Sequence, residues 1–127
     1  MVTTGGTGKG DKDLVYDAVS TLNGEMVFRG VAMSPGKQTL FAKLDETLLF
    51  GLPGRVPATF IAFEQLIRPV LLRMLGISNL FLPEINAVLR RPVRTKTKTV
   101  SFLFSRLFLG ANDPEVEPLR SETKGIL

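Results

Sequence analysis

Apolar and polar residues repeat with two different periods along this chain, and the changes of period divide it into short elements. An apolar lead at residues 1–2 precedes a glycine-rich stretch. After it, apolar residues recur at helical spacing, namely Leu14, Val15, Ala18, Val19 and Leu22. The pattern predicts the end of a strand, a glycine loop and a helix over 11–22 that ends at Asn23-Gly24.

The next fifty residues predict three strands and one long helix. β-Branched and aromatic residues favour strands over 25–33 and 39–44. The uniformly apolar run 48–52 is typical of a strand buried on both faces. Helical spacing predicts a helix over 57–75 with a kink at Pro69. The stripe of this helix that we expect to face the core comprises Phe60, Phe63, Ile67, Val70, Leu71 and Met74.

The composition changes after Gly76, where short strands and turns replace the earlier elements. Strand candidates lie at 84–91, 99–109 and 115–119, and the second alternates apolar and polar residues from Val100 to Ser105. We therefore expect an α/β domain at residues 1–76, followed by a small, incomplete all-β domain at residues 77–127.

The composition limits the chemistry that the chain can perform. Hydrophobic residues make up 44% of the 127 positions and charged residues 22%, as in globular domains. Cysteine and histidine are absent, which excludes disulfides, thiolate nucleophiles, the usual zinc sites and histidine bases. A net charge of +4 is compatible with anionic ligands but does not indicate nucleic acid. Any catalysis must therefore use carboxylates, lysines, hydroxyls, backbone amides and a hard metal such as magnesium.

The candidate site is the stretch Thr3-Thr4-Gly5-Gly6-Thr7-Gly8-Lys9-Gly10-Asp11-Lys12-Asp13. Its four glycines allow the backbone to approach a ligand closely, and the amides at the start of the next helix favour a phosphate. Asp11 and Asp13 lie beside this position, where two carboxylates can hold a divalent metal. In the alternative interpretation, Asp11 only caps the helix and Asp13 only interacts with its dipole.

Two familiar phosphate-binding motifs do not fit this loop. The Walker motif requires glycine at position 3 and Ser or Thr after its lysine, but the chain has Thr3 there and Gly10 after Lys9. The dinucleotide motif requires glycine at position 11, which is Asp11. The loop therefore belongs to another class.

Thr3 to Gly8, with Asp13 five residues later, resembles the molybdopterin-binding loop of MogA/MoaB-type and MoeA-type proteins of molybdenum cofactor synthesis. Three later stretches are similar to the MoeA family in the same order: 30–37 (Gly-Val-Ala-Met-Ser-Pro-Gly-Lys), 51–54 (Gly-Leu-Pro-Gly) and 63–69 (Phe-Glu-Gln-Leu-Ile-Arg-Pro). The resemblance covers nearly all of residues 3–76.

The resemblance implies a partial MogA/MoaB-like three-layer αβα domain and a transferase. Such an enzyme inserts molybdate into adenylylated molybdopterin and releases AMP. On this basis Asp11 and Asp13 are the catalytic residues and the ligands of Mg²⁺. The implied binding residues are Thr4, Gly5, Gly6, Thr7, Gly8, Gly10, Ser34, Pro35, Gly36, Lys37, Leu52, Pro53, Gly54 and Arg55.

The chain departs from the family pattern at two positions near the expected site. Ser34 stands where the family has lysine before Pro-Gly, which removes a cation. Arg55-Val56 stands where the family has Asn-Pro, and Arg55 could replace the missing cation. Both departures affect the expected chemistry more than the expected fold.

The resemblance also implies further domains on both sides of this stretch, so we expect the chain to be a piece of such an enzyme. Missing strands would then come from a homo-oligomer such as a dimer, or from a companion chain. The N-terminus has no apolar signal segment, and the default location is cytoplasmic. Charged residues and Pro69 make the 57–75 helix a poor membrane span.

Two non-catalytic functions remain open from the sequence. The basic run Arg90, Arg91, Arg94, Lys96 and Lys98 could bind nucleic acid, although a solvated hairpin with later phenylalanines in the core is the simpler interpretation. Alternatively, the chain could be a scaffold that retains an interface without the chemistry.

Overall fold

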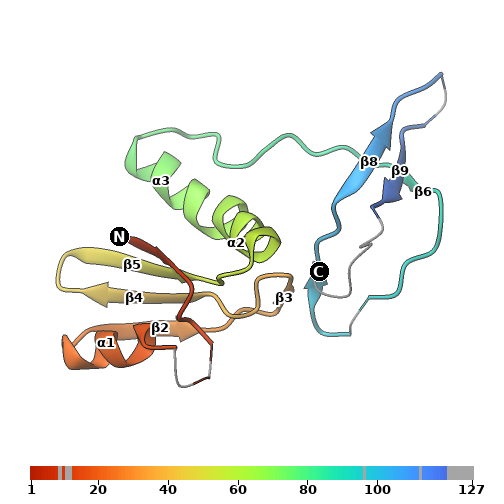
Figure 1. Cartoon of the computed structure of the whole chain (residues 1–127). Helices are drawn as coiled ribbons and strands as arrows, with labels where there is room; N and C mark the ends of the chain where they lie inside the picture. Colours follow the sequence, from red (N-terminus) through yellow and green to blue (C-terminus); the bar gives the residue numbers. More distant parts are fainter. Residues whose placement is uncertain (9, 11–12, 96, 112, 120–127) are drawn as a thin grey trace.

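The computed structural model describes residues 1–8, 10, 13–95, 97–111 and 113–119 (Figure 1). A four-stranded sheet with helices packed on it forms the first part of the chain. A long extended connection leads from it to a second part made of short strands (Figure 1).

The four-stranded sheet has the order β1-β5-β4-β2. Its strands are β1 (Val2–Thr4), β2 (Glu25–Arg29), β4 (Leu40–Leu44) and β5 (Thr47–Leu52). β1 runs parallel to β5, whereas β4 is antiparallel to both of its neighbours. The sheet is therefore mixed, and its parallel pair brings the glycine loop after β1 beside the end of β5.

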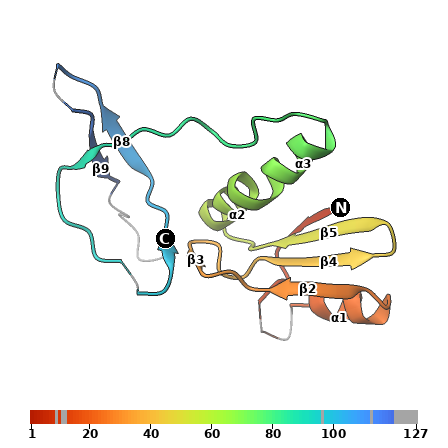
Figure 2. The same ribbon diagram turned by 180° about the vertical axis from the view of Figure 1, so that it is seen from behind.

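Alternating side chains on β4 and β5 give the sheet two buried faces. Leu40, Ala42 and Leu49 pack on one face with Val19 of α1 (Val15–Thr21). Phe50 and Leu52 point to the other face, where they join a core with Ala62 and Ile67 of the second helical segment. Figures 1 and 2 show the helices on opposite sides of the sheet. This confirms the predicted α/β class and its three layers.

The predicted long helix consists of three consecutive segments. α2 (Val56–Ala62) is followed by the π-helix η1 (Phe63–Ile67) and by α3 (Arg68–Met74). The irregularity predicted at Pro69 takes the form of a π turn directly before it.

The π turn changes which residues face the core. Ala58 and Ala62 are four residues apart and buried, but the next fully buried residue, Ile67, comes five residues later. The predicted stripe is therefore wrong at three positions, because Phe60, Leu71 and Met74 are 53%, 41% and 70% exposed. A wider helical turn rotates the following residues relative to a regular 3.6-residue period.

Two other predicted elements are shorter than expected. The first helix begins at Val15 rather than at residue 11. The strand predicted over 25–33 ends at Arg29, because Gly30 takes a φ of +105°. Met33–Ser34 instead form β3, which pairs in parallel with β7 (Val100–Ser101) of the second part.

The second part contains a three-stranded sheet of order β6-β9-β8, with β6 (Val88–Leu89), β8 (Ser105–Phe108) and β9 (Glu115–Pro118). The strand predicted over 99–109 is interrupted at 102–104 and becomes β7 and β8. Phe102 leaves the strand to pack against the core of the first part. The domain boundary near Gly76 stays a prediction.

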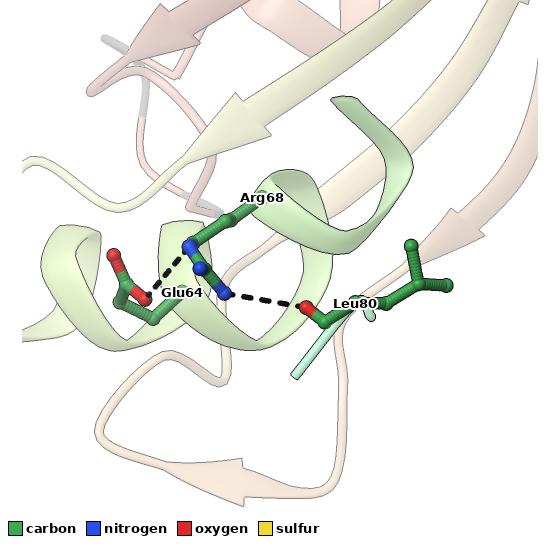
Figure 3. Close-up of polar contacts among 3 residues, drawn as sticks. All are labelled: Glu64, Arg68 and Leu80. Atoms are coloured by element: carbon green, nitrogen blue, oxygen red, sulfur yellow. Dashed lines mark hydrogen bonds and ion pairs between the residues drawn. The ribbon is translucent and has the colours of Figure 1, made fainter. Parts of the chain in front are cut away.

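Arg68 links the helices to the extended connection (Figure 3). Its Nε lies 3.7 Å from Glu64 Oε2, and its Nη1 donates to the Leu80 carbonyl oxygen at 3.2 Å. Because Arg68 is only 29% exposed at its side chain, this contact fixes the path of the chain after α3.

Candidate functional site

The glycine loop begins where β1 ends. Gly5 and Gly6 have φ values of +82° and +66°, a region that L side chains rarely adopt. The Gly5 amide donates to the Leu52 carbonyl oxygen at 2.9 Å, so the loop starts beside the last residue of β5. The topology therefore places the first predicted motif next to the third, 51–54.

The centre of the loop is buried and tightly packed. Thr7 is 5% exposed, and its Oγ1 donates to the Leu52 carbonyl oxygen at 3.4 Å. A Cβ at Gly8 would lie 2.9 Å from Gln38 Nε2 and would overlap Asp13 Oδ2. A side chain at position 8 would therefore displace the ends of Asp13 and Gln38 from the loop.

Asp13 is engaged within the loop. Its Oδ2 accepts a hydrogen bond from the Gly10 amide at 2.7 Å. This bond and a second one from the Gly8 backbone hold the pKa of Asp13 below the usual range. Desolvation opposes them, and the nearby positive charge of Arg29 lowers the pKa by a lesser amount. The residue at the N-terminus of α1 is Leu14, without a side-chain cap. Asp13 therefore serves the loop, whatever its interaction with the helix dipole, and its catalytic role stays a prediction.

The structure does not test the magnesium site predicted from Asp11 and Asp13. Asp11 lies outside the described residues. Within the described part of the chain, no group of three or more acidic side chains could hold a metal ion. Asp13 alone, with Oδ2 already bonded to Gly10, does not make a Mg²⁺ site.

A cavity of about 600 Å³ lies beside the loop. Three segments far apart in the sequence line it: the glycine loop, the turn after β2 and the turn after β5. The lining residues are Thr7, Gly8, Arg29, Gly30, Pro35, Gly36, Lys37, Gln38, Pro53, Gly54, Arg55 and Ala58. Its size lies within the range of small-molecule sites, about 300–1,000 Å³.

The cavity includes eight of the predicted binding residues. Thr7, Gly8, Pro35, Gly36, Lys37, Pro53, Gly54 and Arg55 line it. The other six, Thr4, Gly5, Gly6, Gly10, Ser34 and Leu52, do not. Leu52 is buried in the core, and Ser34 pairs with Ser101 in β3. Both residues support the turns that line the cavity without reaching the cavity themselves.

The sequence interpretation missed Arg29 and Gln38. Both flank the 30–37 motif, and nothing in the pattern shows that they turn toward the glycine loop. Arg29 Nη2 donates to the Gly8 carbonyl oxygen at 2.7 Å, and its guanidinium carbon lies 4.2 Å from the centre of the Tyr16 ring. Only the pairing of β2 with β4 brings them to the loop.

The cavity is electropositive. Arg29 and Lys37 line it from the turn after β2 and Arg55 from the turn after β5, and its described lining contains no acidic side chain. Three cations around one hollow favour a ligand with more than one negative charge. This arrangement can bind and orient a phosphorylated small molecule.

Two arginines of the basic run in the second part are paired with acidic side chains. Arg90 Nη2 lies 2.7 Å from Glu115 Oε2, and its guanidinium carbon lies 3.6 Å from the centre of the Phe108 ring. Arg91 Nε lies 4.0 Å from Glu117 Oε1, and Arg91 also donates to the Pro118 carbonyl. The side chains of Arg90 and Arg91 are still 40% and 32% exposed, so both arginines stay at the surface while β9 supplies their acidic partners. Lys96 lies outside the described residues.

Among the helices of the described residues, none is both long and apolar enough to cross a membrane.

Comparison with known proteins identifies relatives for both parts of the chain. Residues 1–73 match the model of a family described as a probable molybdopterin binding domain. A molybdopterin molybdenumtransferase of Staphylococcus aureus is 31% identical over 118 residues, which are 93% of this chain and 28% of that protein. The protein of the same name from Bacillus subtilis is 37% identical over 71 residues, or 56% of this chain and 16% of that one.

Solved structures show the same fold. One crystal structure of the molybdopterin biosynthesis MoeA protein from Pyrococcus horikoshii matches with a TM-score of 0.69 and 29% identity, over 94% of this chain and 27% of that one. A second matches with a TM-score of 0.58 at 19% identity and supports the fold alone. The chain therefore matches only 16% to 28% of the length of these relatives.

Proposed function

Because the chain belongs to the family of probable molybdopterin binding domains, we propose that its glycine-loop cleft binds molybdopterin during molybdenum cofactor biosynthesis. The observation that carries the proposal is the cavity beside Gly8, which three cations from two segments line together with the glycine loop. A pterin with a phosphate end needs both a hollow of this size and positive charge.

The finer proposal concerns the reaction. The curated relatives are named molybdopterin molybdenumtransferases. We propose that this chain contributes to the same transfer, in which molybdate enters adenylylated molybdopterin and AMP leaves. The chain spans 28% of the Staphylococcus aureus relative, so the complete reaction would also need elements that these residues do not include.

The residues of the cleft would act by binding and orientation. Lys37 and Arg55 would neutralise oxyanions of the ligand from opposite turns, and Arg55 would compensate for the lysine that Ser34 replaces. Asp13 would hold the Gly10 amide and so keep the loop in shape. Magnesium would supply further charge neutralisation, but the described residues do not form its site, and no step is assigned to it.

The partner that we propose is a second copy of the chain or a companion chain, in addition to the small-molecule ligand. Each edge of the sheet, β1 on one side and β2 on the other, has one strand neighbour among the described residues. Further strands could pair there.

Equilibrium binding of molybdopterin to the purified chain tests the proposal. We expect Lys37→Ala and Arg55→Ala each to weaken binding about 10-fold, since each removes a charge-assisted contact. Arg94→Ala is the matched control, because Arg94 is exposed and does not line the cleft. Absence of binding to the unmodified chain, or equal loss in the control, would refute the proposal.

Nucleic-acid binding is the less favoured alternative, because Arg90 and Arg91 are already paired with Glu115 and Glu117. A salt-sensitive interaction with single-stranded RNA or DNA that falls in Arg94→Ala but survives Lys37→Ala would support that alternative instead.

A further inference from the structure

Arg29 connects three elements around the cleft. It is the last residue of β2, it donates from Nη2 to the Gly8 carbonyl oxygen at 2.7 Å, and it stacks on Tyr16 of α1 with 4.2 Å between guanidinium carbon and ring centre. The sheet, the glycine loop and the first helix therefore meet at one guanidinium group.

The contact with Gly8 bears directly on anion binding. A carbonyl oxygen carries partial negative charge, and an unpaired one in this loop would repel the same phosphate that the amides attract. Arg29 compensates the Gly8 carbonyl. It also places a positive charge near the carboxylate of Asp13, which occupies the Gly10 amide.

Arg29 retains donors for a ligand. A guanidinium group has several N–H donors in a planar fork, and among the described residues the Gly8 carbonyl is the one hydrogen-bond partner of the Arg29 side chain. The same side chain lines the cavity. A planar group fixed by an aromatic ring can present its remaining donors to two oxygens of a phosphate.

We propose that Arg29 is a positioning and specificity residue of the cleft, which holds the glycine loop through Gly8 and binds the phosphate ester of the ligand. This inference rests on the proposed function. It adds a strand residue to Lys37, Arg55 and the backbone amides of the glycine loop as a group that recognises the oxyanion.

Four variants separate the two roles of Arg29. Arg29→Met removes the charge and the donors, whereas Arg29→Lys keeps the charge but loses the planar fork. Tyr16→Leu removes the stacking surface and leaves Arg29 in place. Arg94→Met is the matched control, because it makes the same chemical change at an exposed position outside the cleft.

The experiment measures the dissociation constants of molybdopterin and of inorganic pyrophosphate at low and at high salt, together with the thermal midpoint of each variant. We expect Arg29→Met to weaken both ligands about 10-fold or more and to reduce the salt dependence of binding. Arg29→Lys should restore the salt dependence but only part of the affinity, and Tyr16→Leu should weaken binding by a few-fold. A purely structural role would change the thermal midpoint without changing the salt dependence.

Two results would overturn the inference. One is that Arg29→Met binds both ligands as tightly as the unmodified chain. The other, which decides the matter if Arg29→Met does not fold, is that Arg29→Lys has unchanged affinity for both ligands. Failure of the proposed function gives a different result: the unmodified chain then binds pyrophosphate in an Arg29-dependent manner but does not bind molybdopterin.

Discussion

The two parts of this chain are held together by different interactions. Among the described residues, the buried hydrophobic core side chains run from Val19 to Ile67, on the two faces of the four-stranded sheet. In the described residues after Gly76, large apolar side chains such as Phe81, Val100 and Leu109 are more than half exposed, at 62%, 61% and 75%. There, backbone pairing and the contacts of Arg90 and Arg91 with β9 connect the strands.

This difference explains why the cleft lies where it does. Binding requires groups fixed by packing, and the glycine loop is fixed because Thr7 is buried against Gly51 and Leu40. The second part attaches to this rigid part through β3–β7 pairing, Phe102 and the ring of Phe104, whose centre lies 6.0 Å from that of Phe60. All the described residues that line the cleft belong to the first part.

The largest difference between the parts should appear in core truncations. Ile67→Ala removes a fully buried side chain and should lower the free energy of unfolding by about 2–5 kcal/mol. Leu107→Ala, at 44% exposure in β8, is the matched control and should cost less than about 1 kcal/mol. Urea unfolding of both variants checks this, and equal losses would show that the second part has a core of its own.

A matched pair of glycines should give the next largest effect. A Cβ at Gly51 would lie 2.8 Å from Leu40 and 2.9 Å from Thr7, both of which are buried, so Gly51→Ala should cost about 1–3 kcal/mol. Gly110→Ala meets nothing within 4 Å and should change stability by less than about 1 kcal/mol. Thermal unfolding measures both, and a tolerant Gly51 would contradict the packing of the loop against the sheet.

The ion pair of the second part should contribute less. A double-mutant cycle on Arg90 and Glu115, which are 40% and 45% exposed, should give a coupling of about 0.2–1 kcal/mol that decreases at high salt. Lys43 and Glu25 in the first part, 3.8 Å apart and 51% and 70% exposed, should show little coupling in the same cycle. If the two couplings are equal, ion pairing does not distinguish the parts.

The smallest effect should come from the titration of Asp13. Its native pKa lies below the usual value of about 3.9, so the carboxylate stabilises the native state above that pH. The contribution is lost as the pH falls through the native pKa, where the group becomes protonated in both states. Unfolding curves of the unmodified chain and of Asp13→Asn, from about pH 6 to about pH 2, should therefore converge in acid. Curves that stay parallel would mean that the Gly10 hydrogen bond does not depend on the charge.

Much of the fold could be predicted from the sequence because local patterns reflect local physics. The hairpin strands 39–44 and 48–52 were predicted nearly to the residue, since alternation and uniform apolar character correspond to burial on one or two faces. The glycines of the loop were predicted to allow backbone conformations that other residues avoid, and Gly5 and Gly6 do have positive φ. The helix stripe failed at Leu71 and Met74 because a π turn before them changes the helical phase, and periodicity assumes a constant one. Phe60 lies before that turn and contacts Phe104 of the second part instead.

The residues of the candidate site also fall into those that the sequence identifies and those that it does not. The three loops that carry Gly8, Lys37 and Arg55 each have a local signature of glycine and proline, so the sequence alone identifies them. Arg29 and Gln38 have no such signature, and only the order β1-β5-β4-β2 brings them to the loop. The acidic partners of Arg90 and Arg91 likewise come from a strand some 25 residues away. The sequence by itself therefore determined which segments can turn tightly and expose their backbone. The tertiary structure decided which charges meet, because the distance between two side chains depends on strand pairing and helical phase rather than on their separation along the chain.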